Sequence, residues 1–388
     1  MNFFKIKKNK IPFGKPLIDG EEIKSVINVL KSGIYAHGPI SKLFEKKFCN
    51  FTGAKYSTTV SSCTAGMHLF YFALGIGRGD EVIVPAQTHT ATAHAVELVG
   101  AKPVFIDCDS STGNIDPKKI QKKISKKTKA ICVVHFLGIP VDMKRINLIA
   151  KKNKLLVLED CALSLGARYN KVHTGLLGDA GVFSFYPAKH ITTGEGGVLI
   201  TKNKKILNRI KLLKSLGINK TFLERKTPGI YDAIDVGFNY RMSEIHASIG
   251  VKQIEKIKKF IQKRKKNFYF LKKIFQKNKN IYILDANSQK YKNSFYCMNV
   301  ILSKKLSKNR MEIIRYLNKR NIGTSIYYPQ PVPRMSYYKK KYGYNKNNFT
   351  NAAIISDRSI SLPVGPHLTL KDLKYISENF LNSLEKFK

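Results

Sequence analysis

The middle of the chain alternates short apolar runs with amphipathic helical patterns, and this alternation restricts the fold more than any other feature. An apolar run at residues 129–138 precedes a helical pattern at 143–152, and a second apolar run follows at 155–158. Strands that alternate with helices predict a mostly parallel sheet covered on both faces. Ligands of such sheets bind beyond the carboxyl ends of the strands. We therefore expect a site near Asp160, which closely follows the second run.

Further elements are expected on both sides of this region, and 388 residues are enough for two domains. Strands are predicted at residues 80–85, 102–107, 198–201, 281–284, 295–302 and 324–328, and helices at 19–31, 41–51, 116–124, 207–216, 243–275, 309–319 and 370–387. The helix at 243–275 has a strongly basic second half, and we place a domain boundary within it. The prediction is a large α/β domain at 1–255 and a smaller α+β domain at 256–388.

One lysine stands in an unusual setting. Lys189 follows an apolar strand that breaks at Pro187, and a glycine-rich turn at 194–197 comes shortly after it. Burying an ammonium group is costly unless its pKa falls or it reacts. A lysine so placed can act as a Schiff-base nucleophile. The ordinary alternative is a strand-end lysine whose head reaches solvent, and these residues alone leave both interpretations open.

The same stretch carries a resemblance. Phe-Ser-Phe-Tyr-Pro-Ala-Lys, followed by Thr-Thr-Gly-Glu-Gly-Gly, resembles the lysine segment of the DegT/StrS family of sugar aminotransferases, which use pyridoxal phosphate (PLP). Family-like segments extend from about Ile11 to about Phe380. The resemblance implies the α/β fold of aspartate-aminotransferase-like PLP enzymes, with a large, mostly parallel sheet domain and a smaller C-terminal domain. It also implies that Lys189 holds PLP covalently and that Ser184 contacts its phosphate.

A second segment suits a phosphate group. Residues 58–69 run from a β-rich start through small hydroxyl residues into a helix. A helix N-terminus offers free N–H groups and a partial positive charge to a phosphate, although an ordinary Ser/Thr cap is much commoner. The segment resembles the family's phosphate-contacting Ser-Gly-Thr-Ala turn, with Cys63 in place of the glycine. The resemblance implies that Thr64 and Ala65 bind the phosphate.

The acidic strand end matches the family as well. Glu-Asp-Cys-Ala at 159–162 resembles the family's Glu-Asp-Ala-Ala, whose aspartate keeps the pyridine nitrogen of PLP protonated. The resemblance gives this role to Asp160, and the alternative is a strand-end acidic cap. Leu163 and Leu165 stand where many members carry glutamine and histidine. A side-chain hydrogen bond from residue 163 to the ring hydroxyl is therefore in doubt.

Two further residues take expected roles from the resemblance. His89 stands where the family has an aromatic ring stacked on the pyridine, and a capping or surface histidine is an equal alternative. Gly-Phe-Asn-Tyr-Arg-Met at 237–242 resembles a family motif whose asparagine reaches the PLP phosphate of the partner subunit. Asn239 therefore implies a homodimer with shared active sites, and a helix cap at Asn239 or Ser243 is compatible with this. For Tyr327 and Tyr328 we favour core positions over a substrate contact.

Neither a disulfide framework nor a metal site is expected. The six cysteines are scattered, without a Cys-x-x-Cys pair or a histidine pair at zinc spacing. Several lie in apolar runs, where a free cysteine behaves as a small hydrophobic residue. His135 also lies in an apolar run, and we interpret it as a satisfied core histidine. The cysteines are Cys49, Cys63, Cys108, Cys132, Cys161 and Cys297.

The formal charge of +43 raises the question of a nucleic-acid partner. The lysines are spread over most surface-like segments, and no nucleic-acid-binding signature accompanies them. We favour biased genomic base composition as the explanation and expect no nucleic-acid partner, although a positive field attracts an anionic small substrate. No apolar run approaches ~20 residues, and residues 1–10 lack the apolar core of a signal peptide. We expect no membrane partner and a cytoplasmic location.

The function implied by the resemblance is amino transfer from L-glutamate, or glutamine, to a keto-sugar linked to a nucleotide, in the making of amino sugars for cell-surface glycans. Three alternatives stay open. Two lie within the family: a PLP-dependent sugar dehydratase, and amination of a non-nucleotide substrate such as a keto-cyclitol. The third is a non-catalytic, basic regulatory or nucleic-acid-binding protein. The dehydratase branch carries histidine at the position of Lys189, which favours the aminotransferase.

Overall fold

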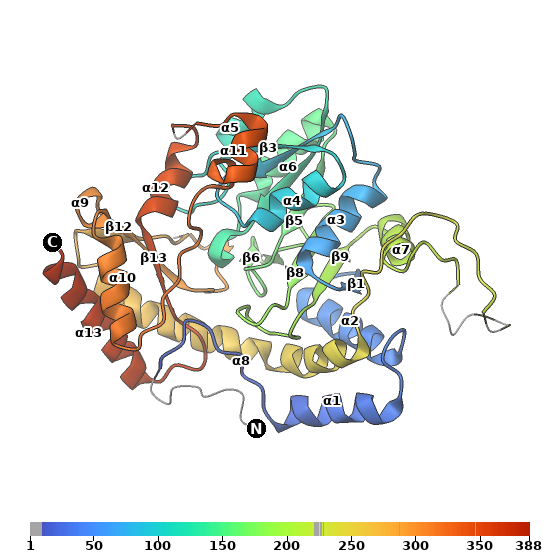
Figure 1. The fold of residues 1–388 in the computed structure, drawn as a ribbon, viewed down its shortest axis with the longest axis horizontal. Coiled ribbons are helices and arrows are strands. Elements are labelled where there is room, and N and C mark those ends of the chain that lie inside the picture. Colours follow the sequence, from blue (N-terminus) through green and yellow to red (C-terminus); the bar gives the residue numbers. More distant parts are fainter. Residues whose placement is uncertain (1–9, 221–224, 226, 228, 287, 346) are drawn as a thin grey trace.

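A seven-stranded sheet forms the centre of the molecule. The computed structural model describes residues 10–220, 225, 227, 229–286, 288–345 and 347–388 (Figure 1). The strand order is β1-β9-β8-β5-β4-β2-β3, and only β9 runs against the others. The strands are β1 (Tyr56–Val60), β2 (Glu81–Pro85), β3 (Lys102–Ile106), β4 (Thr128–Val134), β5 (Leu156–Asp160), β8 (Ala180–Ser184) and β9 (Gly197–Thr201).

Helices cover both faces of this sheet, which explains why its inner strands are apolar over most of their length. In β4, Ala130 and Cys132 pack on one face, while Ile131 and Val133 pack on the other. The helices of this part are α1 (Gly20–Ser32), α2 (Pro39–Thr52), α3 (Cys63–Ala73), α4 (Thr90–Leu98), α5 (Pro117–Ile120), α6 (Met143–Asn153) and α7 (Lys204–Leu213). Helix α7 begins before the predicted residue 207 because Asn203 caps it and accepts hydrogen bonds from two backbone N–H groups.

A three-stranded antiparallel sheet forms the smaller part, in the order β10-β12-β13. Its strands are β10 (Ile281–Ile283), β12 (Met298–Leu302) and β13 (Ser359–Leu362). Its helices are α9 (Lys304–Ser307), α10 (Arg310–Lys319), α11 (Ser336–Tyr342), α12 (Thr350–Arg358) and α13 (Leu370–Lys386). A minor sheet joins β6 (Arg168–Tyr169) to β7 (Val172–His173) and β11 (Tyr291–Lys292). Short 3-10 helices lie at Gln121–Lys123, Phe136–Gly138 and Val332–Arg334.

The predicted strand at 324–328 is wrong, and β13 takes its place in the small sheet. Within the predicted segment only an isolated bridge forms, between Ser325 and Ser361. The Tyr327 carbonyl accepts a hydrogen bond of 3.2 Å from the Gln87 side chain. The segment therefore leaves the small sheet and contacts the loop after β2. The segment has residues that favour strands, but it contacts the larger part of the molecule instead of pairing within the small sheet. A local sequence pattern does not reveal such a contact.

One long helix, α8 (Glu244–Phe275), connects the two parts and runs along one side of both (Figure 1). Its first half packs into the core under α2 and β8, through Ala247 and Val251 among others. Its second half packs into the core of the small sheet, through Phe268 and Leu271. A change of core within one helix accords with a boundary placed in it, and the division at residue 255 stays a prediction. Within the described ranges, no helix has both the length and the apolar character needed to cross a membrane.

Candidate active site

A cavity of about 250 Å³ lies at the carboxyl ends of β4, β5 and β8. This is the edge of the sheet at which the strand pattern predicts a ligand site. Five of the seven predicted site residues line it: Thr64, His89, Asp160, Ser184 and Lys189. Its other lining residues are Ser62, Cys63, Met67, Thr88, Ala91, Val134, Ala162, Leu163, Tyr186, Glu195 and Tyr328.

Helix α3 points its N-terminus at the cavity. Ser62 is the N-cap, and its hydroxyl oxygen accepts a hydrogen bond of 3.0 Å from the Ala65 N–H. The N–H groups of Cys63 and Thr64 make no hydrogen bond within the described part of the chain. Gly197 lets the helix approach the sheet, since a Cβ atom there would lie 2.8 Å from the Cys63 nitrogen. This end of the cavity therefore offers free donors and the positive end of a helix dipole.

Asp160 is buried at the end of β5 and held by two donors. The Thr92 hydroxyl donates to one carboxylate oxygen at 2.8 Å, and the Ala162 N–H donates to the other at 3.0 Å. The Cys63 thiol lies 3.9 Å from the second oxygen. A carboxylate has room for more than one hydrogen bond on each oxygen. Asp160 is thus fixed in place, and its carboxylate can still accept a hydrogen bond from a group bound in the cavity.

Lys189 reaches the same cavity from the turn after β8. Its side chain is partly buried, and its Nζ atom lies 5.7 Å from the centre of the Tyr296 ring. Burial lowers the pKa of the Lys189 amino group, while the nearby Asp160 and Cys63 partly oppose this shift. A lowered pKa raises the share of neutral amine at neutral pH, and only the neutral amine is a nucleophile.

Ser184 and His89 border the cavity with their polar atoms partly engaged. The Ser184 hydroxyl oxygen accepts a hydrogen bond of 3.4 Å from the Tyr186 N–H. His89 is the N-cap of α4, and its Nδ1 atom accepts a hydrogen bond of 3.1 Å from the Ala91 N–H. Its exposed ring also packs edge to face on Tyr328 at 5.5 Å. The capping interpretation of His89 is therefore confirmed, and the stacking role stays a prediction.

Two predicted residues lie outside the cavity. Ala65 is buried in α3, and its N–H is taken by the Ser62 cap. Asn239 is exposed and pairs with Ser215 in an isolated bridge. The cap of α8 is Ser243, whose hydroxyl oxygen accepts from the His246 N–H at 3.2 Å. Asn239 is therefore free of the capping role, and its role toward a partner subunit stays a prediction.

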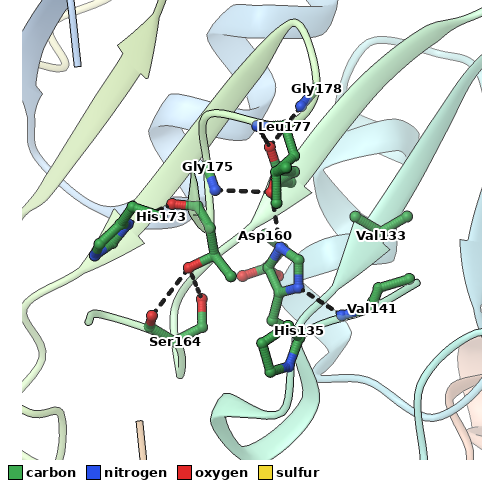
Figure 2. A network of polar contacts seen from close by, with 12 residues as sticks. Val133, His135, Val141, Asp160, Ser164, His173, Gly175, Leu177 and Gly178 are labelled. Atoms are coloured by element: carbon green, nitrogen blue, oxygen red, sulfur yellow. Dashed lines mark hydrogen bonds and ion pairs between the residues drawn. The ribbon is translucent and has the colours of Figure 1, made fainter. Parts of the chain in front are cut away.

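A buried polar network supports the strand end that carries Asp160 (Figure 2). The Glu159 carboxylate accepts hydrogen bonds from His135 Nε2 and from the N–H groups of Gly175, Leu177 and Gly178, all between 2.6 and 2.8 Å. His135 Nδ1 in turn accepts from the Val141 N–H at 3.0 Å. His135 is thus a satisfied core histidine, as predicted.

The same network includes a cluster that could in principle hold a metal ion. Ligand atoms of His135, Glu159 and Cys161 all lie within 4.8 Å of one another. The four hydrogen bonds to Glu159 already use both of its oxygens, and the His135 ring is used at both nitrogens. We therefore assign these residues a structural role.

The sequence did not indicate the positions of several residues in or near the cavity. Tyr328 was expected in the core; it is buried, but its ring also borders the cavity. Glu195 lies within the glycine-rich turn and was read only as part of a motif. Thr92 does not line the cavity, and its role in holding Asp160 had no local signal, because it depends on a contact between residues 68 positions apart in the chain.

Known proteins resemble this chain over nearly its whole length. A sequence profile of the DegT/DnrJ/EryC1/StrS aminotransferase family matches residues 16–381. GDP-perosamine synthase of Escherichia coli O157:H7 is 36% identical over 371 residues, which cover 95% of this chain and 97% of that protein.

Solved structures agree with these sequence matches. PseC of Helicobacter pylori, an aminotransferase involved in the biosynthesis of pseudoaminic acid, superposes with a TM-score of 0.92 at 28% identity, over 98% of this chain and 100% of that one. Spr1654 of Streptococcus pneumoniae, assigned as a sugar aminotransferase and solved in its PLP form, gives a TM-score of 0.91 at 28% identity, with 98% and 100% coverage.

Proposed function

The chain belongs to the DegT/DnrJ/EryC1/StrS aminotransferase family, as predicted, and on this premise we propose that it transfers an amino group from L-glutamate to a keto-sugar carried on a nucleotide, with PLP as cofactor. The observation that carries the proposal is the single cavity that holds Lys189, Asp160 and the N-terminus of α3 together. The predicted fold class is that of its structural relatives.

The residues of the cavity fit PLP. The free N–H groups of Cys63 and Thr64 and the Ser184 hydroxyl suit its phosphate. Asp160, held by Thr92 and Ala162, suits the protonated ring nitrogen. When bound, PLP supplies an electron sink for the carbon atom that loses its proton.

The chain's own groups then divide the work. Lys189 would hold the cofactor through its Nζ atom, and its neutral amine would serve as the general base toward the donor carbon. Asp160 holds the proton on the ring nitrogen, because a buried carboxylate stabilises a cation beside it. Leu163 lines the cavity close by and has no side-chain donor or acceptor. Recognition of the ring hydroxyl therefore falls to other groups.

The names of the relatives support a nucleotide-linked sugar as the substrate class. One of them is named for a GDP-linked amino sugar and another for the pseudoaminic acid pathway. The formal charge of +43 attracts a dianionic nucleotide sugar over distance. We place the reaction in amino-sugar synthesis for cell-surface glycans and in the cytoplasm.

A homodimer with shared sites completes the proposal. No arginine is among the described residues that line the cavity, although phosphate and carboxylate groups favour arginine partners. A separate basic cleft of about 840 Å³ includes Lys211, Arg225 and Arg241, and Arg241 closely follows Asn239 in the chain. An exposed apolar stripe on α1, with Ile23, Ile27 and Leu30, offers a surface for a second copy to cover.

Subunit mixing tests the shared site. Asn239→Ala is expected to weaken PLP retention about tenfold, because one hydrogen bond to a charged phosphate is lost. At a PLP concentration too low to fill the Asn239→Ala sites, mixing this variant with inactive Lys189→Ala protein should restore activity, since each heterodimer has one intact site. About a quarter of the sites are then complete in an equal mixture. Heterodimers that form but regain no activity would contradict the shared site.

The function itself is tested by product analysis. The protein, loaded with PLP and supplied with glutamate, is expected to convert at least one member of a panel of nucleotide-linked keto-sugars to an amine. Mass spectrometry of the product with ¹⁵N-glutamate shows whether the amine comes from the donor. Release of a deoxygenated sugar instead would identify a dehydratase. If every nucleotide-linked keto-sugar stayed unchanged and a free keto-cyclitol were aminated, the proposed substrate class would be wrong.

A further inference from the structure

Tyr296 lies next to Lys189, on the segment that precedes β12 of the small sheet. Just before it, the Ser294 N–H donates to the Gly138 carbonyl at 3.1 Å, and the Ser294 hydroxyl donates to the Leu163 carbonyl at 3.0 Å. His190, the neighbour of Lys189, donates from Nε2 to the Ser294 carbonyl at 3.0 Å. The segment is thus fastened to the loops after β4 and β5 and to the lysine turn itself.

Tyr296 is held at both its ring and its backbone. Its ring hydroxyl lies 2.5 Å from the Tyr327 hydroxyl, and its backbone carbonyl accepts a hydrogen bond of 2.8 Å from Arg264 Nη1. Arg264 and Tyr296 are both buried. Tyr327 is itself placed by the Gln87 side chain and by stacking on Phe13 at 5.8 Å. The Tyr327 hydroxyl therefore fixes the ring at its hydroxyl end, and Arg264 fixes the backbone that carries the ring.

The amino group of Lys189 has no hydrogen bond within the described part of the chain, and the Tyr296 ring centre at 5.7 Å is the contact that locates it. A ring face attracts a cation within about 6 Å. We propose that Tyr296, held by Tyr327 and Arg264, is a positioning residue that keeps the free amino group of Lys189 in the cavity. The proposal rests on the role proposed above for Lys189.

The chemistry of this contact suits a lysine that must also react. A ring face attracts the charged ammonium group of a lysine but attracts the neutral amine much less. The contact with Tyr296 therefore weakens when the amino group of Lys189 loses its proton. An ion pair would favour the ammonium more strongly, raise the pKa of Lys189 further and leave less of the neutral amine. Other titratable groups near Lys189 are Asp160 and Cys63 across the cavity, His89 at the start of α4, and His190 beside it. Glu195, Tyr186 and Tyr328 line the same cavity.

Fluorinated side chains test the contact with little change in the size of the ring. The full-length protein, freed of PLP, is prepared with Tyr296→Phe and then with mono-, di- and trifluorinated phenylalanine at position 296. The phenylalanine variant is the reference, because every member of the series lacks the hydroxyl that contacts Tyr327. Each fluorine weakens the negative ring face, so the pKa of Lys189 should fall stepwise, by about half a unit to one unit in total. The pKa is measured by competitive acetylation across pH, with peptide mapping to isolate Lys189.

The same series at Tyr282, an exposed residue of β10, is the matched control and should leave the pKa of Lys189 unchanged. A Lys189 pKa that stays flat across the series at 296, or that shifts equally in the control series, overturns the positioning role. Acetylation requires neither PLP nor sugar. A flat series in a protein that still makes the amine product therefore defeats this inference alone, and a stepwise fall in a protein that aminates no sugar defeats only the proposed function.

Discussion

Replacing Lys189 with histidine is expected to abolish both covalent PLP attachment and turnover, with activity reduced about 10⁴-fold or more, because nucleophile and proton carrier are lost together. Histidine cannot form the covalent bond to the cofactor. The fold should persist, since the lysine head makes no hydrogen bond within the described residues and its stem is only partly buried. Borohydride reduction followed by peptide mapping measures the attachment, and amine formation measures turnover.

A second sheltered lysine provides the control. Lys214 donates to the Thr59 carbonyl at 2.7 Å, and burial lowers the pKa of its amino group to about 8. A lowered pKa alone would make it a rival for PLP, yet it does not line the cavity. Lys214→Met should therefore leave the reduced adduct on Lys189. An adduct found on Lys214, or on any other lysine of the Lys189→His protein, would show that the site is misassigned.

His190 also bears on reaction type. The dehydratase branch was expected to carry histidine at the lysine position, and here a histidine follows one residue later. The His190 ring is buried and donates to the Ser294 carbonyl, outside the cavity lining. His190 therefore points away from the cavity and does not take the place of the dehydratase histidine. Lys189 is the residue that lines the cavity.

Much of the large sheet could be predicted from sequence because its signal is local. The runs that became β4 and β5 contain long apolar stretches, Ala130–Val134 and Leu156–Leu158, as expected for strands covered on both faces. The position of Asp160 at a strand end then followed from the rule for parallel sheets. In the small sheet the signal failed, because β13 is the short, half-polar stretch Ser-Ile-Ser-Leu, and residues 324–328 look more like a strand than it does.

The sequence predicted only those site residues whose role is indicated by the residues next to them in the chain. Lys189 and the start of α3 each have a recognisable local pattern. Thr92, which holds Asp160, and Tyr296, which lies behind Lys189, owe their roles to residues 68 and about a hundred positions away in the chain. Such contacts arise from topology, and a single sequence with no aligned relatives does not reveal them.

Replacing Asp160 with asparagine is expected to lower the rate of the half-reaction with glutamate about 10²–10³-fold while the fold and bound PLP persist. The carboxylate accepts from the Thr92 hydroxyl and the Ala162 N–H. An amide oxygen can replace one of these acceptors, and the Thr92 hydroxyl can turn to accept from the amide NH₂. The local hydrogen bonds are therefore conserved in number, which is why the variant should still fold.

What the amide cannot supply is charge. Its NH₂ group donates to an unprotonated ring nitrogen, whereas the carboxylate stabilises the protonated one, so the electron sink is weakened at the step that needs it. Stopped-flow absorbance of the conversion of the cofactor to its amine form measures this rate. Asp179→Asn is the matched control, because Asp179 makes the same kind of contact, accepting from the Val157 N–H at 2.7 Å, at the opposite end of β5. A half-reaction that ran at the unmutated rate in Asp160→Asn, or that slowed equally in Asp179→Asn, would remove Asp160 from its proposed role.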